Sequence, residues 1–170
     1  MTLRDTILTE HSKANCMKII QAIGSSQRKF DQLVKLFLHD DNKVIQRAGW
    51  PLSYIAETHP ELVSKHTGTL IRNLRKPGLH NAVKRNTLRI FRDISVPKRY
   101  QGELMSRCFD YILSPLEKPA IKSFSLAILR NLSRQYPDIK HEIKTIIEEK
   151  WDQESPAFKS QAKWFLVHSS

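Results

Sequence analysis

The sequence predicts an all-α fold, an α-α superhelix (solenoid) of about four to five stacked helix pairs. A nine-residue pattern recurs at spacings of 37 or 38 residues, the period of architectures in which each unit buries its apolar face against its neighbours. The chain also has only 5 glycines beside 8 prolines. That balance suits helices that stop at proline better than strands joined by glycine turns.

The recurring pattern forms the second helix of each predicted pair. Its copies begin with an apolar residue, at Ile45, Val83, Ile121 and Phe158. The apolar stripe continues seven residues later on the same helical face, at Leu52, Ile90, Ile128 and Phe165. Between these positions runs a column of small residues: Gly49, Thr87, Ser125 and Ala162. Small side chains there would let neighbouring helices approach closely.

The first helices show a column of their own, and prolines separate the pairs. The column consists of Leu33, Ile71, Phe109 and Ile146, and the prolines are Pro60, Pro97 and Pro137. We therefore expect helix pairs at about 30–59, 68–96, 104–135 and 143–168. A shorter copy of the second-helix pattern covers residues 12–20 and places Cys16 in the small column. The predicted organisation is one domain, 1–170, with a partial or capping repeat over 1–28 and repeats over about 29–66, 67–103, 104–142 and 143–170.

These patterns resemble HEAT repeats, whose second helix typically begins with an acidic residue, then Val-Arg, then small and leucine positions. The equivalents here are Val83-Lys84, Ile121-Lys122 and Phe158-Lys159. The resemblance covers nearly the whole chain. It implies an armadillo-like α-solenoid, usually a binding scaffold rather than an enzyme. By fold and charge only, the chain is also similar to the HEAT-like bacterial alkylpurine DNA glycosylases.

The resemblance also suggests a structural role for part of a lysine column. In HEAT repeats this position usually forms a ladder with an acid five residues earlier, and Glu117 and Glu154 precede Lys122 and Lys159 in that way. In the second repeat the acid position holds Leu79. Lys84 therefore lacks a ladder partner within its own repeat and is a candidate for binding.

Most of the net charge of +11 lies in one segment. Residues 65–99 contain ten Lys or Arg residues and one acid, Asp93. The candidate binding residues fall off the apolar stripes of two successive second helices: Lys84, Arg85, Arg89, Arg92, Lys122 and Arg130. Second helices line the concave face of a HEAT array, so the resemblance implies a positive band on the inner surface. Arg92 and Arg130 are 38 residues apart and are expected side by side.

The charge has three interpretations. A solvated basic face needs no partner, an acidic protein would be attracted to it, and nucleic acid would bind through phosphate contacts without sequence readout. Two further positions have competing interpretations. Trp50-Pro51 marks either a helix bend or a pocket around Trp50 and Tyr54. Asp93 is either a surface partner of Arg89 or, by the glycosylase likeness, an inner-face catalytic acid.

Motifs for other chemistry are absent from the sequence. It has no Gly-rich phosphate loop, no nucleophile elbow and no Cys/His metal pattern, so we expect no catalytic residue, no metal and no cofactor. The two cysteines lack paired spacing and are expected to be free thiols. No secretory signal or run of 18 apolar residues occurs, so we expect a cytoplasmic protein without a membrane span.

The predicted function is a non-enzymatic binding scaffold that engages an acidic or phosphate-bearing partner through the basic face. The alternative is a nucleic-acid-binding protein related to the HEAT-like glycosylases. A third hypothesis concerns the last helix, which runs toward Ser170 with no repeat after it to cover its outer flank. That flank would be polar, bind a partner or support homo-oligomerisation.

Overall fold

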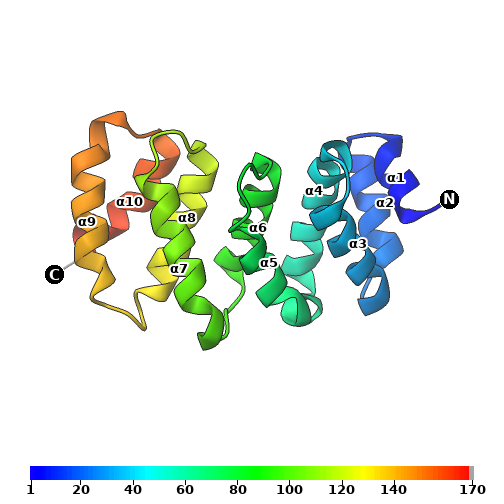
Figure 1. The fold of residues 1–170 in the computed structure, drawn as a ribbon, viewed down its shortest axis with the longest axis horizontal. Coiled ribbons are helices and arrows are strands. Elements are labelled where there is room, and N and C mark those ends of the chain that lie inside the picture. Colours follow the sequence, from blue (N-terminus) through cyan, green and yellow to red (C-terminus); the bar gives the residue numbers. More distant parts are fainter. Residues whose placement is uncertain (169–170) are drawn as a thin grey trace. The chain divides into compact units, whose positions relative to one another are not determined.

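The computed structural model describes residues 1–168, which form helices joined by short connections, with no strand among them (Figure 1). Five helix pairs follow one another: α1 (Leu3–Thr9) and α2 (Lys13–Ile23), α3 (Gln27–His39) and α4 (Asn42–Thr58), α5 (Thr67–Asn73) and α6 (Asn81–Asp93), α7 (Lys98–Leu113) and α8 (Pro119–Leu132), α9 (Ile139–Lys150) and α10 (Pro156–His168). Two 3-10 segments, η1 (Pro60–His66) and η2 (Trp151–Gln153), precede α5 and α10. The predicted all-α fold class, an α-solenoid of helix pairs, is confirmed.

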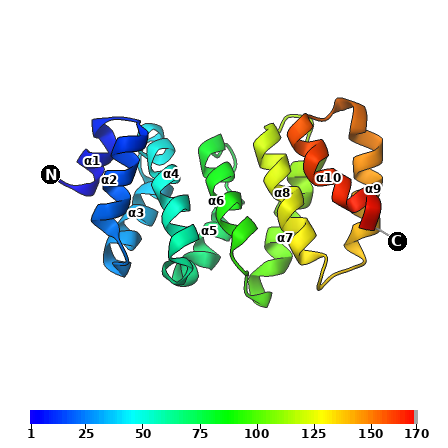
Figure 2. The same ribbon diagram turned by 180° about the vertical axis from the view of Figure 1, so that it is seen from behind.

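The chain forms two compact units, Met1–Ser95 and Val96–Ser170. In the first unit α4 packs against α2, α3 and α6, so that the second helices α2, α4 and α6 lie side by side (Figure 2). In the second unit α8 packs against α7 and α10, and α10 also packs against α9. The single domain over 1–170 and its repeat boundaries stay predictions. The expected end of the last helix at Ser170 lies outside the described residues.

Several helices begin earlier than the apolar pattern predicts. We expected first helices from about residues 30, 104 and 143, whereas α3, α7 and α9 begin at Gln27, Lys98 and Ile139. The opening turns of α3 and α7 are largely polar, so a hydrophobic stripe does not mark them. The Ser26 side chain caps α3 by accepting a hydrogen bond from the Lys29 amide. The N-terminal segment forms a complete but short pair, in which α1 has 7 residues.

The small column is buried as predicted, at Gly49, Thr87, Ser125 and Ala162. Gly49 lies at a close contact between α4 and α6, because a Cβ added there would overlap the side-chain amide of Asn86. That amide is held by a hydrogen bond that its Nδ2 donates to the Ala82 carbonyl at 2.8 Å. A side chain at position 49 would therefore have to displace the Asn86 amide from this hydrogen bond.

Helix α4 continues through Pro51, which removes one backbone donor from its interior. Just before it, the Arg47 guanidinium donates to the carbonyl oxygen of Leu8 at 2.9 Å and helps to hold α1. The cavity beside Trp50 has a volume of only about 10 Å³, and Tyr54 does not line it. This volume is too small for a ligand, so the structure gives no support to a pocket at Trp50. The bend stays a prediction.

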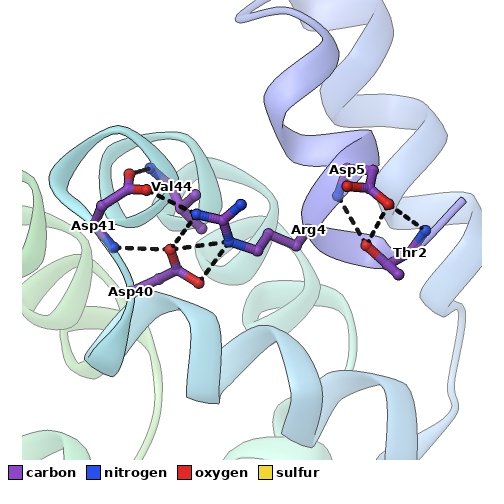
Figure 3. Close-up of polar contacts among 6 residues, drawn as sticks. All are labelled: Thr2, Arg4, Asp5, Asp40, Asp41 and Val44. Atoms are coloured by element: carbon purple, nitrogen blue, oxygen red, sulfur yellow. Dashed lines mark hydrogen bonds and ion pairs between the residues drawn. The ribbon is translucent and has the colours of Figure 1, made fainter.

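Two carboxylate clusters hold the first unit together. Arg4 of α1 forms an ion pair with Asp40 at 2.9 Å and with Asp41 at 2.8 Å (Figure 3). The hydrogen bond from Arg4 lowers the pKa of Asp40 below its ordinary value. Asp41 also caps α4, because its Oδ1 accepts from the Val44 amide at 3.0 Å. One arginine thus ties α1 to the turn between α3 and α4, while Thr2 and Asp5 form a capping box at the start of α1 (Figure 3).

The second cluster fastens η1 to α3. The Asp31 carboxylate lies 2.6 Å from Lys65 Nζ and 2.5 Å from His66 Nε2, and it accepts from Gln27 Nε2 at 2.9 Å. Burial alone would raise the pKa of Asp31, but these hydrogen bonds outweigh it and lower the pKa to about 2. The charge of Lys65 is therefore compensated within the scaffold.

Both cysteines are buried and free of disulfides. Burial raises the pKa of Cys16 to about 11 and that of Cys108 to about 12, so both stay protonated near neutral pH. The position of Cys16 agrees with its predicted place in the small column. Within residues 1–168, none of the helices has the length and apolarity that crossing a membrane would require.

The contact at Gly49 generates a stability prediction. Gly49→Ala should lower the free energy of unfolding by about 1–3 kcal/mol, because the new methyl group overlaps a hydrogen-bonded amide in a packed interface. Gly102→Ala is the matched control: it lies within α7, it is exposed, and a Cβ there meets no atom within 4 Å. The control should raise stability by about 0.5–1 kcal/mol in urea unfolding. An equal gain from both substitutions would contradict the close approach.

Candidate interaction surface

Helix α6 carries four of the six predicted binding residues. The His80 side chain caps the helix, since its Nδ1 accepts a hydrogen bond from the Ala82 amide at 3.0 Å. The apolar stripe is buried, and this fixes the rotation of the helix about its axis. The basic residues between the stripe positions are therefore exposed or half-buried: Lys84, Arg85, Arg89 and Arg92.

Arg85 and Arg89 form the least compensated part of this surface. Arg85 is exposed and Arg89 is half-buried, and their spacing of four residues places them on one face of α6. Within residues 1–168, neither guanidinium forms an ion pair with a carboxylate. Lys84 is half-buried and has an interaction of its own. The α6 surface thus offers two neighbouring guanidiniums to a partner.

Arg92 differs from them because its charge is compensated. Its Nε and Nη2 donate to the two carboxylate oxygens of Asp93 at 3.0 and 2.7 Å. The hydrogen bond from Arg92 to Asp93 raises the pKa of Arg92 further above its ordinary value. Of the two interpretations of Asp93, the surface ion pair agrees with the structure, but the partner is Arg92 and not Arg89. The bidentate pair makes Arg92 a weak candidate for binding a separate anion.

Lys122 of α8 belongs to the scaffold. Its Nζ lies 2.5 Å from Glu154 Oε1, and the two side chains are only 5% and 8% exposed. The ladder interpretation of this lysine is confirmed, but its partner was misassigned: we expected Glu117 of the same repeat, and the acid comes from the following pair. A buried lysine in an ion pair is not accessible to a binding partner.

The direction of this ladder changes the interpretation of the second repeat. In the pair Lys122–Glu154, the acid comes from the repeat that follows the lysine. By the same arrangement, the acid position of the second repeat, Leu79, would face Gln46 of the preceding pair and not Lys84. The missing acid at Leu79 therefore gives no reason to single out Lys84. Lys159 also departs from the expectation, because its Nζ lies 5.4 Å from the ring centroid of Trp151 rather than in an ion pair with Glu154.

Arg130 lies in an aromatic cluster of the second unit. Its Cζ is 4.7 Å from the ring centroid of Trp164, and Lys140 Nζ approaches the same ring at 5.6 Å. The His168 ring stacks on Trp164 at 4.6 Å with an interplanar angle of 9°. The Trp164 side chain is half-buried. The sequence signal missed here is a basic residue followed 34 positions later by an aromatic one on the next second helix.

The structure thus divides the six predicted residues between the two units. Four lie on α6, and Lys122 and Arg130 lie on α8. The predicted side-by-side placement of Arg92 and Arg130, and the single positive band that depends on it, stay predictions. No group of three His, Cys, Asp or Glu side chains in residues 1–168 is arranged to hold a metal ion.

The helix pairs, the small-residue column and the lysine–glutamate ladder define the class of protein: an α-solenoid that serves as a scaffold or binding module. A family model described as a HEAT repeat domain matches residues 3–168. The chain belongs to the HEAT repeat family. Comparison with curated proteins gives no match, and comparison with solved structures gives none either.

The buried ion pair can be tested as part of the scaffold. Lys122→Met should lower the free energy of unfolding by about 3–5 kcal/mol, because it leaves Glu154 buried without its partner. The double variant Lys122→Met/Glu154→Leu should recover most of that loss, since an apolar pair avoids the cost of desolvating charges. Urea unfolding measures both. A small effect of Lys122→Met, within about 0.5 kcal/mol as for ordinary surface changes, would contradict the buried pair.

Proposed function

We propose that this chain is a non-enzymatic binding module that engages an acidic or phosphate-bearing partner through the basic face of α6. The observation that supports the proposal most strongly is the pair Arg85 and Arg89, which share one helix face and lack a carboxylate partner within residues 1–168. The planar guanidinium presents several donors that match the geometry of carboxylates and phosphates.

The surroundings of α6 favour attraction of anions. Residues 65–95 contain eight Lys or Arg residues and one acid. Of the eight cations, Lys65 and Arg92 form ion pairs with Asp31 and Asp93, and Arg75 and Lys84 also have interactions of their own. Two exposed basic residues, at the end of α5 and after it, add to the positive charge: Arg72 and Lys76. Such a potential raises the rate of encounter with an acidic partner and weakens as salt increases.

Catalysis by Asp93 receives no support from its surroundings. Its carboxylate is bound by Arg92, and its side chain is 42% exposed. A catalytic carboxylate usually lies in a cleft with a shifted pKa, held in place by neighbouring groups. Asp93 fits a surface ion pair better, and the proposal therefore assigns it no catalytic role.

A charge-reversal experiment tests the proposed surface. Arg85→Glu/Arg89→Glu should weaken binding of an acidic peptide by at least about tenfold at 0.1 M salt, because both direct contacts are replaced by repulsion. The matched control, Arg28→Glu/Lys35→Glu, changes the net charge equally at exposed positions on α3. It should stay within about twofold of the unchanged chain. Fluorescence anisotropy across a salt series measures all three proteins.

Equal weakening by the two double variants would contradict the proposal, because net charge alone would then attract the peptide. A different result would favour the nucleic-acid-binding alternative: salt-dependent binding of duplex or single-stranded DNA, abolished by Arg85→Glu/Arg89→Glu, while acidic peptides fail to bind.

A further inference from the structure

A second cationic cluster lies in the other unit, around Trp164. Arg130 comes from α8, Lys140 from α9, and Trp164 and His168 from α10. Three helices therefore direct a guanidinium, an ammonium group and an imidazole toward one indole ring. Cation–π contact with a tryptophan holds a charged group in place without neutralising its charge.

We infer that Arg130, Lys140 and His168 around Trp164 form a binding site for the phosphate monoester of a phosphorylated peptide. These residues belong to the second unit, whereas α6 belongs to the first, and the inference goes beyond the proposed function.

The cluster lacks a compensating anion. Within residues 1–168, neither Arg130 nor Lys140 forms an ion pair with a carboxylate. Both cations contact the same ring, at 4.7 and 5.6 Å from its centroid. A phosphate dianion would balance both charges, whereas a single carboxylate would balance only one of them.

His168 adds a third group with a defined tautomer. Its Nδ1 lies 2.9 Å from the Trp164 carbonyl oxygen, which can only accept a hydrogen bond, so Nδ1 is the protonated nitrogen. This leaves Nε2 on an exposed side chain without a hydrogen-bond partner in residues 1–168. Nε2 accepts from a protonated phosphate when the ring is neutral and donates to a phosphate oxygen when the ring is charged.

The same geometry favours a phosphate monoester over nucleic acid. Nucleobases bind single-strand-binding proteins by stacking on open aromatic faces. Here His168 stacks in parallel on the indole at 4.6 Å, and Arg130 lies over it at 4.7 Å. These contacts leave less of the indole surface open to a stacking base. A phosphoserine has about 1.5 to 2 negative charges near neutral pH and three acceptor oxygens, which matches the charges and donors present.

The test is a titration of the full chain with a short peptide that contains one phosphoserine, followed by NMR of the Trp164 indole N–H and the Arg130 Nε–H. We expect saturable shifts of both signals and no such shifts with the unphosphorylated peptide. Arg130→Gln and Lys140→Gln should each weaken binding at least about fivefold. The matched control is Arg134→Gln, an exposed arginine four residues further along the chain with no contact to the indole, and it should stay within about twofold.

The variants distinguish phosphopeptide binding at the Trp164 cluster from binding at the α6 surface. Arg85→Glu/Arg89→Glu should leave the phosphopeptide shifts at Trp164 unchanged, whatever it does to binding at α6. Three results would overturn the inference: equal binding of the unphosphorylated peptide, equal loss in Arg130→Gln and Arg134→Gln, or shifts at Trp164 with single-stranded DNA but not with the phosphopeptide. If Arg130→Gln unfolds the chain, Lys140→Gln decides the question, because Lys140 lies on the separate helix α9.

Discussion

The close approach of successive second helices is the constraint on which the rest of the first unit depends. Gly49 lets the backbone of α4 meet the Asn86 side chain of α6, and Asn86 is in turn held by the Ala82 carbonyl. This contact and the burial of the apolar stripe together fix how α6 is rotated about its axis. The rotation decides that Val83 and Phe91 are buried while Arg85 is exposed and Arg89 half-buried. A packing contact at a glycine thereby determines which charges the helix presents to solvent.

The basic residues divide into two groups by their partners. In the first group a carboxylate compensates the cation: Arg4, Lys65, Arg92 and Lys122. Three of these ion pairs, those of Arg4, Lys65 and Lys122, connect different segments of one unit, and that of Arg92 joins neighbouring residues of α6. In the second group no carboxylate of residues 1–168 forms an ion pair with the cation, as for Arg85, Arg89, Arg130 and Lys140. The net charge of a segment does not show to which group a cation belongs. That depends on whether a carboxylate lies within ion-pair distance of the cation.

The sequence predicted the helix pairs and the small column because both follow from periodic burial, which a single chain records directly. It could not predict the partner of Lys122, because the acid position recurs in every repeat. The same sequence pattern results whether the lysine pairs with the acid of its own repeat or with that of the next one. Structure was needed to choose Glu154. The Trp164 cluster was missed for a related reason. The apolar patterns place Lys140 and His168 on their helices but do not show how α9 and α10 pack, so they do not predict the contacts with Trp164. A half-buried tryptophan also cannot be told from a core tryptophan by its spacing alone.

The central claim is that burial and ion pairing divide the cations into structural and available groups. The most direct measurement is side-chain hydrogen exchange of lysine Nζ and arginine Nε–H groups by NMR, on the unmodified chain. We expect slow exchange for Lys122, and fast exchange for Arg85, close to that of a freely solvated arginine. Exchange at Lys122 as fast as at the exposed Lys35 would contradict the account, and so would strong protection of Arg85.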